Sequence, residues 1–247
     1  MKHLDLFSGI GGFSLGLEAT GGFKTVAFCE IEEYPRKVLR KHWPDVRQYE
    51  DIKKLTYETL RSDGIGSVDI ITGGYPCQPF SNAGKKQGES DPRHLWPEMF
   101  RIIKECRPTW VIGENVSGHV KLGLDAVLAD LEGQGYGTRT FSVSAASVGA
   151  NHKRERIWIV AHSVKGDVEA GRERRRAIRE GHQGEGFPGD VAGRGENPWE
   201  GWWTTEPEVG RMDHGIPKRV DRLKCLGNSL IPMIPFLIGR SILESDG

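Results

Sequence analysis

The sequence predicts an α/β fold, a doubly wound and mostly parallel sheet with a small irregular region late in the chain. Over the first ~160 residues, short apolar runs alternate with helical patterns, which is typical of parallel strands covered by helices on both faces. After residue 163 this alternation stops, and seven glycines fall between residues 181 and 201. A chain of 247 residues is long enough for one sizeable α/β domain and a small extra element.

Each expected element follows from its own local pattern. Short apolar runs predict strands at 3–7, 25–30, 68–74, 109–115 and 156–163. Helical periodicity predicts helices at 13–20, 32–43, 96–106 and 122–136. Pro97 suits a first helical turn, and a glycine ends the helix at 122–136. Regular apolar content returns at 225–245, where we expect a turn and a helix that packs back on the sheet.

The pattern divides the chain into three parts, 1–162, 163–207 and 208–247. The formal net charge is zero, but residues 151–180 hold nine Lys and Arg against five Asp and Glu, and residues 181–210 hold one against six. Residues 211–224 are again basic, with five Lys and Arg against two Asp and Glu. Two basic blocks are compatible with a polyanionic partner and equally with an ordinary solvated surface.

Composition narrows the class of protein. No run reaches the ~18 apolar residues that span a bilayer, and the N-terminus has no long apolar segment of the secretory type. A cytoplasmic location is therefore the default expectation. The four cysteines are spread without a CxxC pair, so we expect reduced thiols, with neither a disulfide framework nor a metal site.

Glycines and acids predict a ligand site at one end of the sheet. Gly9, Gly11 and Gly12 directly follow the first strand, where glycine permits a tight turn and close backbone approach. Glu30 ends the second strand and suits two ribose hydroxyls, and Asp51 suits an adenine amino group. Taken separately, these are a glycine-rich turn and solvated acids; taken together, they favour an adenosine-containing ligand. The absence of a P-loop motif argues against a nucleoside triphosphate.

Cys77 stands in the stretch GGYPCQPFS, where the third expected strand ends. A free cysteine is usually a small buried hydrophobe, but this rigid, polar-flanked loop favours a chemical role. Glu114 closes the next strand, although such an acid can also be simple surface. Arg154 and Arg156 alternate along an extended segment, so both can point into one site.

Several stretches together resemble the cytosine-5 DNA methyltransferase family: DLFSGIGGFSLGLE, Glu30, GGYPCQPFS, GENV, KRERIW and LGNSLIP, in the family's order and over residues 3 to about 243. The resemblance implies a Rossmann-like methyltransferase fold and S-adenosylmethionine as the methyl donor. It also implies a cofactor pocket formed by Phe7, Ser8, Gly9, Gly11, Gly12, Glu30, Ile31, Asp51, Ile52, Pro76, Leu95, Asn228 and Ser229.

The resemblance further implies methylation of carbon 5 of a flipped cytosine in double-stranded DNA, in the manner of restriction–modification enzymes. The thiolate of Cys77 would add to carbon 6, and Glu114 would protonate ring nitrogen 3. Arg156 would contact the base carbonyl, and Arg154 would orient the base or its phosphate. DNA contacts are expected from Ser81, Lys85, Lys86, Arg93, Arg172, Arg174 and Arg175, although a solvated loop and a solvated arginine run explain these residues equally well.

The chain departs from the family pattern in three places. His152 stands where the family usually has glutamine, and Ile31 stands where a larger residue commonly stacks on adenine. The target-recognition region, 163–207, is short, which favours a short recognition sequence, relaxed specificity or a partner. We expect a monomer.

Three alternatives remain at this stage. A cytosine-5 methyltransferase acting on transfer RNA would carry the same residues. A non-catalytic DNA-binding relative would keep the fold, but Cys77, Glu114, Arg154 and Arg156 are all present. A thiol hydrolase or redox enzyme would need a base or a resolving cysteine near Cys77, and the sequence has neither at motif spacing.

Overall fold

The computed structural model describes residues 1–76, 95–121, 123–163 and 225–245. Its elements are β1 (Lys2–Leu6), α1 (Gly12–Glu18), β2 (Lys24–Cys29), α2 (Glu33–His42), β3 (Arg47–Tyr49), α3 (Tyr57–Ser62), β4 (Ile70–Gly73), α4 (Trp96–Cys106), β5 (Trp110–Val116), the 3-10 turn η1 (Ser117–Lys121), α5 (Leu124–Gly133), β6 (Tyr136–Val143), the 3-10 turn η2 (Ala145–Val148), β7 (Arg156–Ser163) and α8 (Met233–Ser245).

The strands form one seven-stranded sheet in the order β3-β2-β1-β4-β5-β7-β6. Within it β1, β2, β3, β4 and β5 pair in parallel, and β7 runs antiparallel between β5 and β6. The mostly parallel, doubly wound sheet predicted from the sequence is therefore confirmed. The strand order reverses between β1 and β4, and in such sheets ligands bind beside the carboxyl ends of the strands at that reversal.

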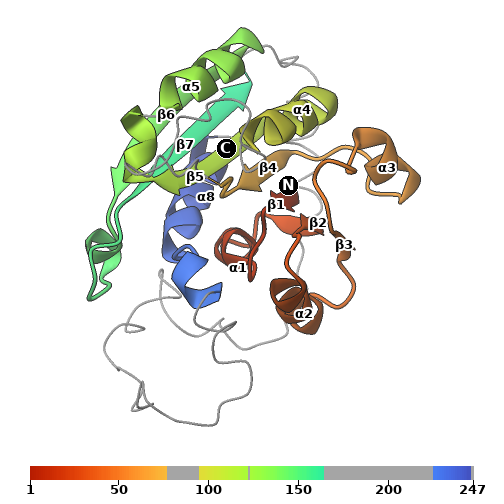
Figure 1. Ribbon diagram of the computed structural model, residues 1–247, viewed down its shortest axis with the longest axis horizontal. Coiled ribbons are helices and arrows are strands. Elements are labelled where there is room, and N and C mark those ends of the chain that lie inside the picture. The colour runs from red at the N-terminus through yellow and green to blue at the C-terminus, as the bar shows by residue number, and fades with distance from the viewer. Residues whose placement is uncertain (77–94, 122, 164–224, 246–247) are drawn as a thin grey trace, which may run out of the picture.

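Helices lie on both faces of the sheet (Figure 1), and a hydrophobic cluster lies between the sheet and the helices on each face. One cluster joins the sheet to α3, α4 and α5 through buried residues such as Leu60, Met99 and Leu131. The other joins it to α1, η2 and α8, with Trp158 and Phe13 in edge-to-face contact at 5.6 Å. The sheet is thus covered by helices on both faces, as its apolar strands require.

Helix α8 returns the far end of the chain to α1. A Cβ atom at Gly16 would overlap the carbonyl oxygen of Pro232, so only glycine allows this approach. By length and composition the segment Cys225–Ser245 would be long enough to cross a membrane, which the sequence pattern had not indicated. Met233, Phe236 and Ile242 are nevertheless buried in the cluster that contains α1, as in a core helix.

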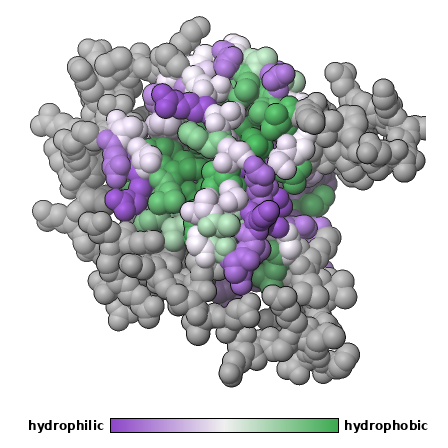
Figure 2. Space-filling view, turned by 90° about the vertical axis from the view of Figure 1, so that its left-hand side faces the viewer, coloured by the Kyte–Doolittle hydropathy of each residue, from purple (hydrophilic) through white to green (hydrophobic). Residues whose placement is uncertain are grey.

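Some apolar surface of the described residues remains outward. Figure 2 shows hydrophobic surface gathered in the middle of one face, beside a band of hydrophilic residues. Among the described residues, Leu226, Leu237 and Phe141 are exposed by 63%, 46% and 45%.

Polar side chains form a buried chain across the centre of the sheet. The two ring nitrogens of His3 lie 3.2 Å from the hydroxyl of Thr25 and 2.7 Å from that of Thr72. Asp5 accepts a hydrogen bond from the hydroxyl of Ser14 at 2.8 Å and a longer one from Thr72 at 3.4 Å. Burial lowers the pKa of His3 to about 3 and raises the pKa of Asp5 to about 8.

Most elements lie where the sequence predicts them, and α4 and β7 have the predicted bounds. The pattern did not predict β3, α3 or β6. The helix expected to run to residue 136 ends at Gly133, and the chain continues at once into β6.

Candidate active site

The loop after β1 is shaped by residues with positive φ. Phe7, Gly9 and Gly11 have φ values of 52°, 54° and 86°. Such a conformation is strained for phenylalanine and often marks a functional site. The hydroxyl of Ser8 donates to the carbonyl of Asp5 at 2.6 Å and accepts from the backbone nitrogen of Cys29 at 3.2 Å. These bonds fix the loop against the end of β2.

Glu30 is held by the backbone around it. Its two carboxylate oxygens accept from the backbone nitrogens of Gly9 at 2.8 Å and Glu32 at 2.7 Å. Burial raises the pKa of this carboxyl, and these two hydrogen bonds and the guanidinium of Arg36 act in the opposite direction. The side chain is thereby oriented toward the cavity described next.

A cavity of about 190 Å³ lies beside the carboxyl ends of β1, β2 and β3, and it is lined by Phe7, Cys29, Glu30, Ile31, Glu50, Asp51, Ile52, Lys53 and Leu95. The lining combines carboxylates with the apolar groups of Phe7, Ile31 and Ile52. This combination suits a sugar with free hydroxyls joined to a flat heterocycle, and so fits the nucleoside part of S-adenosylmethionine.

The predicted cofactor residues fall into three groups. Six of them line the cavity: Phe7, Glu30, Ile31, Asp51, Ile52 and Leu95. Ser8, Gly9, Gly11 and Gly12 belong to the loop and the helix start behind it, and Pro76 follows β4. Asn228 and Ser229 precede α8, and Ser229 lines a different cavity. The sequence reasoning missed Cys29, Glu50 and Lys53, although each adjoins or lies close to a residue that it named.

Glu114 and Arg156, the residues expected to contact the cytosine base, meet at the carboxyl end of β5. They are called the base side of the site below. The Nε of Arg156 lies 3.0 Å from Oε1 of Glu114, and both side chains are largely buried. A Cβ at Gly74, just after β4, would lie 3.2 Å from Oε2 of Glu114, so the ends of β4 and β5 are tightly apposed. Because β7 is antiparallel to β5, its first residue reaches the end of β5.

Two guanidinium groups compete with burial at Glu114. Burial raises the pKa of this carboxyl, while Arg156 and Arg154 lower it, and the pKa stays above the ordinary value. The pKa of Arg154 is lowered by burial and by Arg156. A carboxyl of this kind can carry a proton at a higher pH than an ordinary glutamate and can donate it.

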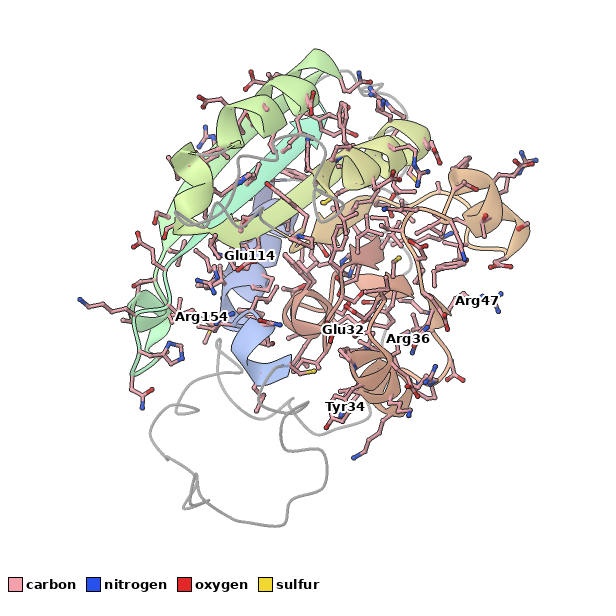
Figure 3. The ribbon with its side chains drawn as sticks, in the orientation of Figure 1. Glu32, Tyr34, Arg36, Arg47, Glu114 and Arg154 are labelled. Atoms are coloured by element: carbon pink, nitrogen blue, oxygen red, sulfur yellow. The ribbon has the colours of Figure 1, made fainter. Side chains whose placement is uncertain are left out.

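Arg154 connects the start of β7 to the C-terminal segment. Its two terminal nitrogens donate to the carbonyl oxygens of Gly227 at 2.6 Å and Ser229 at 2.8 Å. A second cavity of about 530 Å³ lies here, lined by Leu15, His152, Arg154, Leu226, Gly227, Ser229, Leu230, Ile231, Pro232 and Met233. In Figure 3, Glu114 and Arg154 lie on one side of α1, and Glu32 and Arg36 lie on the other.

Several predicted residues lie outside the described part of the chain. They are the expected nucleophile Cys77 and the expected DNA contacts Ser81, Lys85, Lys86, Arg93, Arg172, Arg174 and Arg175. The flanks of the first segment are described, with Tyr75 and Pro76 on one side and Leu95 on the other. Among the described residues, no group of three or more His, Cys, Asp or Glu is placed to hold a metal ion.

Comparisons with known proteins identify the family of the chain. The family described as C-5 cytosine-specific DNA methylase matches residues 1–185. The Type II methyltransferase M.HgiCII of Herpetosiphon aurantiacus is 37% identical over 169 residues, which are 66% of this chain and 38% of that protein. The Type II methyltransferase M.CviJI of Paramecium bursaria Chlorella virus IL3A is 36% identical over 172 residues, 68% of this chain and 44% of that protein.

Solved structures show the same fold. DNMT2 of Spodoptera frugiperda superposes with a TM-score of 0.57 at 24% identity, over 67% of this chain and 51% of that one. At this identity the likeness concerns the fold alone. The chain spans between 38% and 44% of the length of the two curated relatives named above.

Proposed function

Because the chain belongs to the C-5 cytosine-specific DNA methylase family, we propose that it methylates carbon 5 of cytosine in double-stranded DNA. S-adenosylmethionine is the methyl donor, and Cys77 is the nucleophile. One observation carries the proposal: the cavity with Glu30 and Asp51 and the Glu114–Arg156 pair lie at the same edge of the sheet. The strand that leads to Cys77, β4, lies between them.

On the cofactor side, this chain's residues bind and orient. The carboxylate of Glu30, already held by two backbone nitrogens, has lone pairs left for the hydroxyls of a ribose. Asp51 accepts from an amino group on the heterocycle, and Ile31 and Ile52 cover its faces. The bound donor supplies an electrophilic methyl group on a sulfonium.

On the base side, the residues change the reactivity of cytosine. The thiolate of Cys77 adds to carbon 6, while Glu114 donates a proton to ring nitrogen 3, so negative charge does not build up on the ring. Carbon 5 then has enamine character and takes the methyl group. The methyl transfer leaves a neutral thioether in place of the sulfonium. Water then takes the proton from carbon 5, ring nitrogen 3 returns its proton to Glu114, and Cys77 departs as the thiolate, which restores the aromatic ring.

Protonation of Glu114 is the step that its surroundings favour. The carboxyl is largely buried, and its pKa lies above the ordinary value despite two neighbouring guanidinium groups. Arg156 holds one carboxyl oxygen of Glu114 through its Nε, and its proposed role is to donate to the base carbonyl through a terminal nitrogen. The contact with Arg156 therefore affects both the orientation of the Glu114 carboxyl and its pKa.

For Arg154 we propose a role beside the one expected from the resemblance. Its two hydrogen bonds to the carbonyls of Gly227 and Ser229 hold the segment that contains Asn228. In this way Arg154 orients the C-terminal contribution to the cofactor site. Contact with the base or its phosphate then falls mainly to Arg156 and to residues outside the described part.

The division of labour along the chain is also a proposal. Residues 1–162 form the catalytic and cofactor-binding part, 163–207 select the target sequence, and 208–247 return to the catalytic part. DNA contacts come from Lys85, Lys86 and the arginines near 172–175. The cytosine leaves the duplex to reach the site, at a cost of a few kcal/mol. The protein acts in the cytoplasm as a monomer, without a metal.

The test is methyl transfer from labelled S-adenosylmethionine to unmethylated mixed-sequence DNA, with transfer RNA as a parallel substrate. We expect label in DNA, located by sequencing, and none with the Cys77→Ser variant. Cys106→Ser is the matched control, because burial raises the pKa of that thiol to about 12 and it lies at the end of α4. Label in transfer RNA alone would replace DNA by RNA as substrate, and DNA binding without any label would indicate a non-catalytic relative.

A further inference from the structure

The two flanks of the segment that carries Cys77 meet in one buried aromatic cluster. Tyr75 follows β4 and is exposed by 3%, and Trp96 opens α4 and is exposed by 4%. Their ring centroids are 5.1 Å apart. The described residues on the two sides of positions 77–94 therefore lie close together in the core.

Tyr75 is fixed at both its side chain and its backbone. Its hydroxyl shares a hydrogen bond of 2.8 Å with Nε2 of His119, and the two rings are in edge-to-face contact at 5.4 Å. Its carbonyl oxygen accepts from the side-chain nitrogen of Asn115 at 3.1 Å. Asn115 is in turn oriented by the backbone nitrogen of Val116, which donates to its side-chain oxygen at 2.9 Å.

The hydrogen-bond partners of Tyr75 come from β5, the strand that carries Glu114, and from η1, the turn that follows it. Asn115 is the next residue along β5, and His119 lies in η1, which follows β5 directly. A Cβ at Gly113 would lie 3.4 Å from the Tyr75 ring, so the ring also rests on the strand backbone. The hydroxyl thus joins the end of the β4 segment to η1, the turn that directly follows the strand carrying Glu114.

Trp96 is anchored independently. Its indole nitrogen donates to Asp130 of α5 at 2.8 Å, and its ring stacks on Phe100 one turn along α4 at 5.8 Å. Tyr75 therefore packs on one side against a ring that is itself fixed. The hydrogen bond to His119 adds a directional constraint on the Tyr75 ring that ring packing alone does not supply.

We infer that Tyr75 and His119 are positioning residues for methyl transfer: their hydrogen bond sets where the Cys77 segment starts relative to Glu114. Hydrophobic burial alone does not need the hydroxyl, because a phenylalanine ring fills the same space. A hydroxyl bonded to a buried imidazole selects a single placement of the ring. This inference rests on the proposed function for its kinetic consequence, but not for its structural one.

Tyr75→Phe tests the inference, and Tyr136→Phe is its matched control. Tyr136 is also exposed by 3%, and its hydroxyl donates to the carbonyl of Pro108 at 2.7 Å, at the start of β6 and away from the site. We expect Tyr75→Phe to slow single-turnover methylation about tenfold, with the KM for S-adenosylmethionine unchanged. Tyr136→Phe should lose similar thermal stability and keep the wild-type rate.

Two readouts do not require activity. Hydrogen exchange of the backbone at 70–76 and 95–100 should be faster in Tyr75→Phe than in wild type and unchanged in Tyr136→Phe. The rate at which iodoacetamide alkylates Cys77, followed by mass spectrometry, should change several-fold in Tyr75→Phe alone, with the partly exposed Cys225 as internal standard. His119→Phe should reproduce both effects, and the double variant should add little to either.

The outcomes separate the two proposals. If wild-type protein transfers no methyl group, the proposed function fails, and exchange and alkylation still decide the role of Tyr75. If Tyr75→Phe and Tyr136→Phe behave alike in rate, exchange and alkylation, the hydrogen bond is merely structural and the inference is overturned. If the losses of methylation rate in Tyr75→Phe and His119→Phe add fully in the double variant, the two residues do not act through their hydrogen bond. That result would also overturn the inference.

Discussion

The two halves of the candidate site are held by different kinds of contact. On the cofactor side, the cavity is lined mainly by residues 7 to 53, and Glu30 is gripped by backbone nitrogens. On the base side, Glu114 is paired with a side chain, Arg156, and Arg154 reaches a segment 73 positions away in the chain. The cofactor side is thus formed by residues close in the sequence and held by backbone hydrogen bonds. The base side is formed by residues far apart in the sequence and held by charged side chains.

This difference has consequences for what each half can do. Backbone N–H donors do not titrate and are kept in every substitution except by proline, so Glu30 keeps one orientation, as the proposed binding role requires. The proton affinity of Glu114 results from burial opposed by two guanidinium groups, so small changes in either shift it. Substitutions on the cofactor side should therefore act on affinity, and those on the base side should act on rate.

The largest effect is expected at Glu114. Glu114→Gln keeps the size of the side chain and removes the transferable proton, so single-turnover methylation should fall by about 10²- to 10⁴-fold with the affinity for S-adenosylmethionine unchanged. Glu155→Gln makes the same charge change at an exposed neighbour, bonded to Ser142, and should have little effect. An equal loss of affinity and rate in Glu114→Gln would contradict the separation of the two halves.

A smaller effect of the opposite kind is expected at Glu30. Glu30→Gln replaces charge-assisted hydrogen bonds to ribose hydroxyls by neutral ones, which should weaken cofactor binding about 10- to 100-fold. Titration calorimetry measures this, and saturating S-adenosylmethionine should restore the rate. Glu33→Gln, in an exposed pair with Lys37, is the control. A rate that stays low at saturation would show that Glu30 also acts in the chemical step.

The local half was the easier one to predict. Glycines after a strand and an acid at the end of the next strand form a short-range pattern, and Phe7, Glu30 and Asp51 do line one cavity. Two of the three residues missed there, Glu50 and Lys53, lie close to β3 in the chain, a strand of three residues without an apolar run. Strand β6 escaped prediction for a similar reason, because it lies at a sheet edge, where five of its eight residues are exposed and no continuous apolar run is needed.

The distant half needed tertiary information. The antiparallel direction of β7 places Arg156 beside Glu114, and no feature of RIWIVAHS reveals that direction. The bond of Arg154 to Gly227 and Ser229 depends on how α8 returns to α1, which a 3.6-residue period does not specify. The Tyr75–His119 pair joins residues 44 positions apart through a hydrogen bond that neither residue type predicts alone.

The next effect concerns Asp5, which lies beneath both halves and bonds Ser14 of α1 and Thr72 of β4. Its pKa is about 8 in the folded protein and ordinarily 3.8, so the folded state binds the extra proton between these values. Stability from this group is full below pH ~4 and is lost as pH rises toward 8. His3, with a pKa of about 3 against an ordinary 6.5, acts the other way, and its stabilisation grows as pH rises from 3 to 6.5.

Asp5→Asn isolates these contributions. Between pH ~6.5 and ~8 Asp5 titrates and His3 does not, so wild type should lose about 1–2 kcal/mol more unfolding free energy than the variant over this range. Below pH 6.5, the variant should show the rise with pH that His3 causes. Urea unfolding at each pH measures both. Parallel pH profiles of the two proteins would mean that Asp5 is ionised in the folded state, and the buried chain would then be charged.

The smallest effect tests whether the cofactor half is preformed. The indole nitrogen of Trp43 donates to Glu18 at 2.8 Å, Glu18 also accepts from the backbone nitrogen of Thr25 at 2.8 Å, and the indole ring lies against Gly11. Trp43 thus supports the loop from outside the cavity. Trp43→Phe removes the donor and part of the ring, so the Kd for S-adenosylmethionine should rise about threefold while the saturated rate stays constant.

Trp110→Phe is the control, because Trp110 lies at the opposite end of the sheet beside His162, and it should leave the Kd for S-adenosylmethionine unchanged. If Trp43→Phe lowered the methylation rate but not the affinity for S-adenosylmethionine, the cofactor side would be coupled to the chemical step. The proposed separation, in which the cofactor side acts on affinity and the base side on rate, would then be wrong.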